Sequence, residues 1–366
     1  MGFFAEYKQV NKLLQQKQEV VFYAESRHYH PYFEKLINDL LVKNVPICYI
    51  TSDAADPLLK SQGQMKVIYV KWLLGFLFSK IKASVLIMTM PDLGNFLFKR
   101  SPGVGTYVYM FHAAVSTHQQ YRKAAFNNYD AVFCTGRYQE QEIRLAEKLY
   151  NKKQKELIPY GYPLLDEIKN KNAPVNKKLT LLIAPSWFEG CIFDICIEEL
   201  LQQLSGLPYS VILRSHPEYE KRKKKKFRTI QKLVSRYPDM SVDTMPNVID
   251  RLPSTDVLIT DRSGIALEFA FGTGRPVLFI ETALKTINPN REELNMEPIE
   301  NKLRSQLGVT VSPSALNQLS EKIGELEKMK REFAERMLQL KKAIFYNGEE
   351  SYRAGLDFVL SKIANR

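Results

Sequence analysis

The chain has 366 residues and a formal net charge of +12, from 52 Lys and Arg against 40 Asp and Glu. One hydrophobic core seldom serves more than about 250 residues, so we expect two domains of a globular protein. The basic excess indicates an anionic partner: acidic lipid, a phosphorylated substrate or nucleic acid.

Several classes of protein are excluded. No apolar run reaches the roughly 18 residues that a membrane-spanning helix needs. The start of the chain carries no cleavable signal, and Glu6 stands where a myristoylation motif needs Ser or Thr. The four cysteines are scattered without a C-x-x-C pair, which predicts a reducing compartment and no structural zinc. We therefore expect a cytoplasmic protein, with a membrane surface as a candidate partner.

Short apolar runs alternate with helical patterns through the first half of the chain. Candidate strands are 20–24, 45–51, 66–70, 84–89, 107–111 and 131–135, with helices over 31–42, 72–82 and 139–149. This alternation predicts βαβ units and a parallel sheet. Segment 72–82, WLLGFLFSKIK, is interpreted as a helix packed on the sheet; the alternative is an interfacial helix whose lysines reach lipid headgroups.

Polar side chains follow several of these strands, where α/β proteins place their ligands. His28 and His30 follow the first strand, Asp92 follows strand 84–89, and His112 comes directly after strand 107–111, with His118 beyond it. Surface histidines are more often solvated than functional. His112 differs because its strand fixes it in place, and a fixed neutral imidazole can take a proton from an attacking hydroxyl.

A second α/β series follows a polar stretch, Lys169–Lys178, which we interpret as a linker. The predicted domains are 1–170 and 171–346, with a C-terminal helix within 347–366 that packs back on the first domain. Expected strands are 179–184, 210–213, 241–243, 256–260 and 277–280, with helices over 191–204, 314–344 and 351–363. The run KRKKKK at 221–226 is either a solvated helix face or a surface for an anionic partner.

The stretch Asp256–Glu281, DVLITDRSGIALEFAFGTGRPVLFIE, predicts strand, tight loop, helix and strand. Asp261, Arg262, Ser263 and Gly264 form the loop, which brings a hydroxyl and backbone N–H groups to the positive end of a helix. Such a place binds phosphate. Ser263 could instead be only an N-cap. Glu268, about one turn further on, is placed to meet a ribose hydroxyl of the same ligand.

Other polar groups follow the strands of the second half. Pro185, Ser186 and Trp187 follow strand 179–184, while Arg214 and His216 follow strand 210–213. We expect the two domains to face a central cleft that receives these residues together with His112 and Asp92. Arg and His supply charge, a helix start binds oxygen atoms and an aromatic covers a base or sugar, which suits a diphosphate donor. His216-Pro217 alone could be a simple turn.

Several familiar chemistries have no motif here. The sequence has no Walker lysine loop, no G-x-G-x-x-G after the first strand, no H-E-x-x-H and no G-x-S-x-G. No metal-ligand cluster is visible, so no metal site is predicted. A non-catalytic nucleic-acid or membrane binder is indicated only by the isoelectric point, and the lysine run lacks the interleaved aromatics of nucleic-acid binding, so we expect no nucleic-acid partner.

The second half resembles the CDP-glycerol glycerophosphotransferases, the teichoic-acid-type polymerases and primases. Their "APTW"-like segment is similar to Ala184-Pro185-Ser186-Trp187, and their R-x-H-P segment to Arg214-Ser215-His216-Pro217. Their D-Y-S-S-x-x-x-D loop resembles Asp261–Gly264 with Glu268, where Arg262 replaces the aromatic. Their G-x-P-R-x-D segment resembles Gly161–Asp166. The resemblance covers residues 155–285 well and the first domain loosely.

This resemblance implies an α/β fold of GT-B type, with two Rossmann-like parallel-sheet domains. It implies that His112 is the catalytic base. Asp92, from its place after strand 84–89, is a further catalytic candidate. The donor site would be Pro185, Ser186, Trp187, Arg214, His216, Asp261, Arg262, Ser263, Gly264 and Glu268. His28, His30 and His118 are candidates for binding the acceptor. No cofactor is implied, although a divalent cation stays open.

The implied function is transfer of glycerol phosphate, or a similar polyol phosphate, from a CDP-activated donor to a hydroxyl of a lipid-linked or cell-surface glycan precursor, with release of CMP. The expected setting is teichoic acid or capsule biosynthesis at the inner face of the cell membrane, with the basic surface held near anionic lipid. The alternative is a nucleotide-sugar glycosyltransferase or a UDP-N-acetylglucosamine 2-epimerase-like enzyme, whose T-D-S-G-G-x-x-E loop Thr260–Glu268 approaches.

Overall fold

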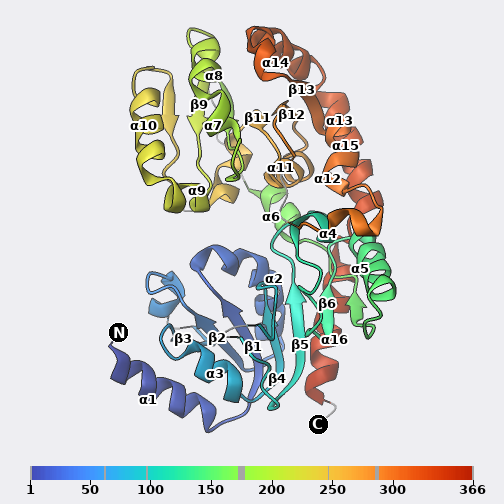
Figure 1. The fold of residues 1–366 in the computed structure, drawn as a ribbon. Helices are drawn as coiled ribbons and strands as arrows, with labels where there is room; N and C mark the ends of the chain where they lie inside the picture. The colour runs from blue at the N-terminus through green and yellow to red at the C-terminus, as the bar shows by residue number, and fades with distance from the viewer. Residues whose placement is uncertain are drawn as a thin grey trace. The chain divides into compact units, whose positions relative to one another are not determined.

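The computed structural model describes residues 2–61, 63–95, 98–171, 178–245, 247–284 and 288–364 (Figure 1). The chain divides into two compact units. Unit 1 comprises Met1–Pro163, Ile287–Met296 and Ile344–Arg366; unit 2 comprises Leu164–Thr286 and Glu297–Ala343. The linker predicted at Lys169–Lys178 falls largely on residues 172–177, outside the described residues, so the domain division at 170/171 stays a prediction.

Among the described residues, unit 1 contains a seven-stranded parallel sheet in the order β3-β2-β1-β4-β5-β6-β7. Its strands are β1 Gln18–Ala24, β2 Ile47–Thr51, β3 Lys66–Tyr69, β4 Ala83–Met88, β5 Val104–Met110, β6 Ala131–Phe133 and β7 Glu156–Ile158. Its helices are α1 Phe3–Leu14, α2 His30–Val42, α3 Leu74–Lys80, α4 Thr117–Gln120, α5 Arg137–Leu149 and α16 Glu349–Ala364, with short 3-10 turns at Arg27–Tyr29, Pro57–Lys60 and Arg291–Leu294.

Helices bury both faces of this sheet, which is why its strands read as continuous apolar runs. Phe33 and Leu36 of α2 pack on one face together with Phe358 of α16. Leu77 of α3 and Val10 of α1 pack on the other. Within segment 72–82, α3 packs on the sheet through Leu74, Leu77 and Phe78, as interpreted from the sequence, while Trp72 and Phe76 stay exposed.

The end of the chain returns to unit 1. The Asn347 side chain bonds the backbone N–H and C=O of Tyr162 at 3.2 and 3.1 Å. Gly161 has a φ of +85°, and a Cβ at this position would overlap the carbonyl oxygen of Tyr346. Only glycine lets the two segments approach this closely. The C-terminal helix thus rests on the same sheet as α2.

Unit 2 contains, among the described residues, a six-stranded parallel sheet in the order β10-β9-β8-β11-β12-β13. Its strands are β8 Leu179–Ile183, β9 Tyr209–Leu213, β10 Met240–Val242, β11 Val257–Thr260, β12 Val277–Ile280 and β13 Gly308–Val311. Its longer helices are α8 Ile197–Leu204, α10 Lys224–Val234, α11 Ile265–Thr273, α14 Leu319–Lys328 and α15 Lys330–Ile344. The shorter ones are α6 Leu164–Asn170, α7 Ile192–Ile195, α9 Pro217–Arg222, α12 Ile299–Lys302 and α13 Arg304–Leu307, with 3-10 turns at Val248–Asp250, Leu252–Ser254 and Pro313–Gln318.

Two expected helices are divided. The helix expected over 191–204 breaks at Cys196, whose φ of −150° is outside the helical range, and becomes α7 and α8. The helix expected over 314–344 is a 3-10 turn followed by α14 and α15. The sequence analysis missed α1, β7 and β13 altogether. All four cysteines are buried and free.

Both sheets reverse their strand order at one point, as Rossmann-type sheets do, and ligands bind outside the carboxyl ends of the strands there. The reversal lies between β1 and β4 in unit 1 and between β8 and β11 in unit 2. The prediction of two Rossmann-like parallel-sheet domains is confirmed. Among the described residues, no helix is both long and apolar enough to cross a membrane.

Candidate active site

The loops at the β8/β11 reversal are tied together by one buried carboxylate. Asp261 follows β11 directly and has no solvent exposure. Its Oδ1 accepts hydrogen bonds from the backbone N–H of Ser186 at 2.9 Å and of Arg262 at 2.6 Å, and its Oδ2 accepts one from Ile192 at 3.1 Å. An ionised carboxylate satisfied by backbone donors fixes the path of every segment that donates to it. The segment after β8, the start of α7 and the serine loop therefore share one anchor.

The serine loop, residues 261–264, leads into α11. The N-cap of α11 is Gly264, so Ser263 is not the N-cap that the alternative interpretation required. The Ser263 hydroxyl has no hydrogen-bond partner within the described part of the chain, and its residue is partly exposed. Glu268 is 8% exposed, on the first turns of α11. A free hydroxyl at a helix start is the arrangement that binds an oxyanion.

The segment after β8 adds a second hydroxyl and an aromatic ring. Ser186 is buried, and its Oγ has no hydrogen-bond partner among the described residues. Pro185 precedes it, and the Trp187 ring lies 6.2 Å from the ring of His216. The Nδ1 of His216 accepts the amide of Glu218 at 3.1 Å, so donation from His216 to a ligand has to come from Nε2. The Arg222 guanidinium covers the Trp187 ring at 4.9 Å.

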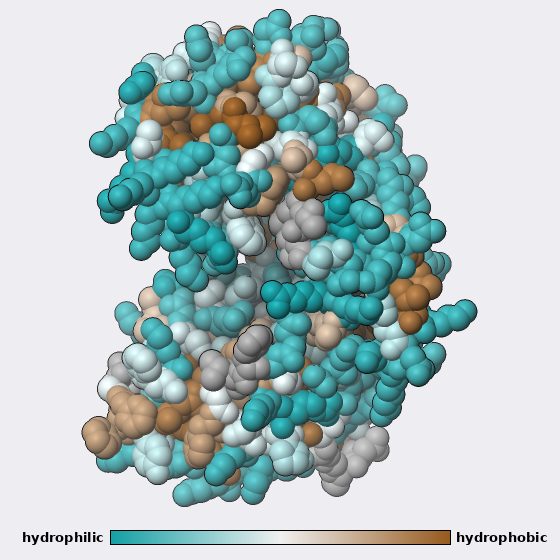
Figure 2. Space-filling view, viewed as in Figure 1, coloured by the Kyte–Doolittle hydropathy of each residue, from teal (hydrophilic) through white to brown (hydrophobic). Residues whose placement is uncertain are grey.

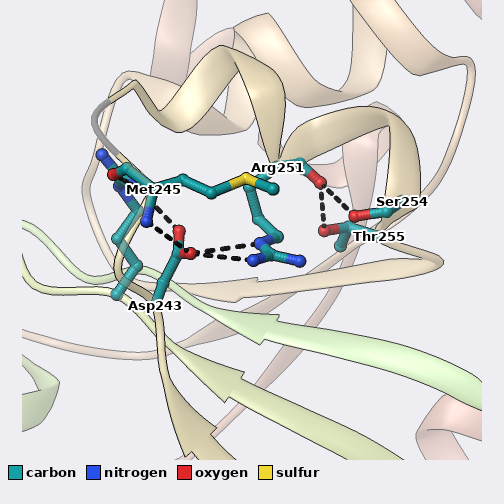
Figure 3. A network of polar contacts seen from close by, with 6 residues as sticks. Asp243, Met245, Arg251, Ser254 and Thr255 are labelled. Carbon is teal, nitrogen blue, oxygen red and sulfur yellow. Dashed lines mark hydrogen bonds and ion pairs between the residues drawn. The ribbon is translucent and has the colours of Figure 1, made fainter. Parts of the chain in front are cut away.

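Arg214, a predicted phosphate-binding residue, is directed to a carboxylate. Its Nη1 bonds Asp243 at 2.6 Å and the Met245 carbonyl at 2.9 Å. Arg251 bonds the other oxygen of Asp243, at 3.0 and 3.2 Å, in the network of Figure 3. The Asp243 side chain is fully buried and the Arg214 side chain 14% exposed. Two guanidiniums around one carboxylate leave a net positive charge at the end of β9. In this geometry, however, Arg214 mainly stabilises the loop after β10 through Asp243 and Met245.

A second arginine beside the serine loop was missed by the sequence analysis. Arg304, on α13, donates to the Asp261 carbonyl at 2.8 Å, and its guanidinium stacks on Phe279 at 4.1 Å. Burial, and then the charge of Arg262, lower the pKa of Arg304 to about 10, so it stays charged at neutral pH. Arg262 itself bonds Glu281. Two arginines with one half-exposed carboxylate between them leave this side of the loop cationic.

In unit 1, His112 lies just beyond β5, among aromatic rings. Its ring is 5.2 Å from Tyr29, 6.1 Å from Tyr32 and 6.5 Å from Tyr121. Its Nδ1 is buried and lacks a hydrogen-bond partner in the described residues. Burial lowers the pKa of His112 to about 4, although the Thr89 backbone acts the other way. His112 is thus a neutral imidazole at pH 7 with a nitrogen available to accept a proton.

Three further predicted site residues of unit 1 are Asp92, His28 and His30. Asp92 lies beyond β4, the strand next to β5, in a left-handed conformation with a φ of 63°. His28 is exposed, and the His30 ring lies 5.8 Å from Tyr49. The loop after β1 reaches His112 through Tyr29. The one-turn spacing of Tyr29 and Tyr32 was the sequence signal for this contact.

His118 holds another segment of the chain in place. Its side chain is 2% exposed, with Nε2 3.0 Å from the Met296 carbonyl and Nδ1 3.4 Å from the Glu142 carboxylate. Asn288 donates to the His118 carbonyl at 2.8 Å. These contacts fix residues 288–296 on unit 1. An acceptor would have to displace one of them to reach the imidazole.

A metal site is not evident in the described ranges. No three His, Cys, Asp or Glu side chains among those residues come together in a way that could hold an ion. Arg214, Arg262 and Arg304 contribute positive charge to the candidate site.

Replacing the anchor tests its role in the fold. Asp261→Asn keeps the shape but leaves the buried backbone donors with one amide oxygen, so we expect it to lower the free energy of unfolding by about 3 kcal/mol. Asp256→Asn, at the other end of β11, is the matched control because Asp256 is 22% exposed and accepts Thr180 N and Lys330 Nζ. We expect this control to cost about 1 kcal/mol or less. Equal losses in chemical denaturation would contradict the anchor.

The Asp243 network predicts a pH dependence of stability. Burial by itself would raise the pKa of Asp243, but the Arg214 and Arg251 guanidiniums and the Met245 amide outweigh it and hold that pKa below its usual 3.8. A lowered folded-state pKa adds stability at pH values above 3.8, and this stability is lost as the pH falls below it. The stability difference between wild type and Asp243→Asn should therefore be full at pH 6 and shrink below about pH 4.

Asp239→Asn is the control for that measurement. Asp239 forms a half-exposed ion pair with Lys178 at 2.8 Å, and exposed pairs contribute little. Denaturation curves should give nearly the same stability for this variant and wild type at every pH. An Asp243→Asn difference that stays constant down to pH 2 would rule out the proposed linkage.

Comparison with known structures places this architecture in a wider group. The wall teichoic acid polymerase TagF matches with a TM-score of 0.64 at 15% identity, over 99% of this chain and 97% of that chain. A TagF variant soaked with CDPG matches with a TM-score of 0.64 at 14% identity, over 98% and 93%. MnaA of S. aureus, solved with UDP, gives 0.62 at 12% identity, over 96% and 99%. The predicted GT-B-like fold is confirmed.

Sequence comparison identifies the family. No curated protein matches the chain. The family model described as CDP-glycerol:poly(glycerophosphate) glycerophosphotransferase matches residues 10–297, which is well over half of the chain. The resemblance found in the sequence is confirmed by this match. The chain belongs to the CDP-glycerol:poly(glycerophosphate) glycerophosphotransferase family and is a transferase of that type.

Proposed function

We propose that this protein transfers glycerol phosphate, or a similar polyol phosphate, from a CDP-activated donor to a hydroxyl of a lipid-linked or cell-surface glycan precursor and releases CMP. Family membership supports the donor class. The observation that carries the proposal is His112, whose pKa of about 4 makes it a neutral base at the end of β5. Teichoic acid or capsule biosynthesis is the setting that fits this reaction.

The donor is assigned to unit 2. The Ser263 hydroxyl and the first N–H groups of α11 bind phosphate oxygens, with the buried Ser186 hydroxyl beside the same Asp261 anchor. Arg262 and Arg304 add positive charge, and His216 adds a donor at Nε2. Trp187 offers a ring face for the base or sugar. Glu268 is assigned to the ribose and Arg214 to long-range attraction of the phosphates.

The chemical step needs one proton acceptor and a stabilised leaving group. His112 takes the proton of the acceptor hydroxyl as its oxygen attacks the phosphorus that adjoins glycerol. The new P–O bond forms while the bond from that phosphorus to the bridging oxygen breaks, and the electron pair leaves with CMP. Positive charge and helix N–H groups stabilise the oxyanion of CMP, which is where transition-state charge develops. We assign to Asp92 the role of orienting groups near the base, His112.

The net charge of the chain is the basis for the proposed membrane location. An anionic membrane surface is the proposed partner because the chain carries a net charge of +12 and acts on a lipid-linked acceptor in this proposal. His28, His30 and His118 remain the candidates for acceptor contacts. Of these, His28 is the exposed one.

A UDP-sugar enzyme is the second candidate. MnaA, solved with UDP, has a TM-score of 0.62, so the fold fits it as well as it fits TagF. The loop Thr260–Glu268 also approaches the epimerase pattern. The family match favours the CDP-activated donor. The two candidates differ in the nucleotide released, CMP or UDP.

His112→Ala tests the reaction. With CDP-glycerol and a lipid acceptor that ends in a glycerol-phosphate hydroxyl, CMP release should fall about 10²–10⁴-fold, as loss of a general base does. Binding of CDP-glycerol, measured by calorimetry, should be retained. In the wild type, kcat/KM should stay level with falling pH until near pH 4, because His112 must be neutral.

Two results would contradict this role. Unchanged CMP release in His112→Ala would remove His112 from the mechanism. An acid limb near the ordinary histidine pKa of 6.5 would show that the group responsible is not His112 in its buried state.

A further inference from the structure

Five large aromatic side chains are exposed on α1, on α3 and on the turn that leads into α3, all in unit 1. This aromatic surface consists of Phe3, Phe4, Tyr7, Trp72 and Phe76. Phe4 is 82% exposed and Trp72 69%. In Figure 2 tan and brown atoms gather over α1 and α3, the region labelled in Figure 1. Aromatic rings that find no place in the core usually mark an interaction site when they gather in this way.

A buried carboxylate holds α1 to the turn that leads into α3. Glu6 of α1 has no exposure, and its Oε1 accepts the backbone N–H of Lys71 at 3.0 Å and of Leu73 at 2.7 Å. Val10 and Leu13 bury the same side of α1 against the core of unit 1. The aromatic surface is therefore a fixed part of the fold, with its rings turned away from a well-packed interior.

The charge around the aromatic surface has one sign. Residues 2–17 and 71–82 contain six lysines, all exposed, and one carboxylate, the buried Glu6. The lysines are Lys8, Lys12, Lys17, Lys71, Lys80 and Lys82. The Lys80 ammonium lies 4.7 Å from the Phe76 ring and the Lys71 ammonium 5.7 Å from the Trp72 ring. Aromatic rings with lysines beside them match the boundary between headgroups and acyl chains of an anionic bilayer.

We propose that the aromatic surface docks the protein on an anionic lipid bilayer, with the rings at the headgroup level and the lysines on acidic phosphates. A second copy of the chain fits poorly, because an isologous contact would set six lysines against six lysines. This inference rests on the membrane partnership proposed above and is independent of the transfer chemistry.

The lysine run of unit 2 is the rival surface. One exposed face of α10 carries Lys224, Lys225, Arg228 and Lys232, none of which forms an ion pair with another described residue. Lys223 and Lys226 pair instead with Asp194, at 2.8 and 2.6 Å. No aromatic side chain shares this face of α10, whose one aromatic residue, Phe227, is buried. The lysine run can attract anionic lipid, but it has no exposed aromatic side chain that could insert between the headgroups.

Vesicle flotation separates the two surfaces. The full chain is mixed with phosphatidylcholine vesicles with or without phosphatidylglycerol, in the absence of donor. The wild type should float only with phosphatidylglycerol, and Phe4→Ser/Trp72→Ser should lower its partition coefficient about tenfold or more. The control Val42→Ser/Leu149→Ser removes exposed apolar side chains elsewhere on unit 1, 80% and 50% exposed, and should bind like wild type.

Lys224→Gln/Lys225→Gln/Arg228→Gln should change the partition coefficient less than about threefold. Titration with CDP-glycerol on each variant should match wild type, which separates a failure of docking from a failure of the proposed reaction. The inference is overturned if wild type ignores anionic vesicles, if the aromatic variant floats like wild type, or if the α10 variant loses binding instead. It is also overturned if the chain is a dimer that Phe4→Ser/Trp72→Ser dissociates.

Discussion

Unit 2, to which the proposed function assigns the donor, depends on one carboxylate that is fully buried, Asp261. Asp261 accepts three backbone N–H groups from three separate segments. Removing a charge from water is costly, so the anchor is stable only while all of these donors are in place. The same contacts that satisfy Asp261 set the positions of the Ser186 and Ser263 hydroxyls. The stability of the fold and the geometry of the proposed donor site are therefore linked through a single side chain.

Unit 1 uses burial in a different way. His112 is placed by a strand end and surrounded by tyrosine rings, and this environment keeps the imidazole neutral at pH values where an exposed histidine starts to be charged. A general base has to be uncharged to accept a proton, whereas side chains that bind phosphate have to carry a positive charge. Arg304 illustrates the contrast, since it remains charged although burial lowers its pKa to about 10. Burial therefore shifts the pKa of a polar group in each unit, His112 in unit 1 and Arg304 in unit 2.

The sequence predicted most of this architecture because buried parallel strands are continuous apolar runs. It missed β7 and β13, which lie at sheet edges and are only partly buried, and α1, whose buried face includes the polar Glu6. The serine loop was predictable from its strand-loop-helix pattern. Arg304 was not, because it reaches the loop from 43 residues away and no local pattern marks such a contact. The importance of Asp261 as an anchor was likewise visible only in three dimensions.

The central claim is that the serine loop anchored by Asp261 binds a cytidine diphosphate donor. Calorimetric titration of the wild type and Ser263→Ala with CDP-glycerol and with UDP-N-acetylglucosamine tests it most directly. The account predicts that CDP-glycerol binds and that Ser263→Ala weakens this binding about tenfold, as loss of a hydrogen bond to a charged group does. Preferential binding of the UDP-sugar, or equal affinity of the variant and wild type for CDP-glycerol, would contradict it.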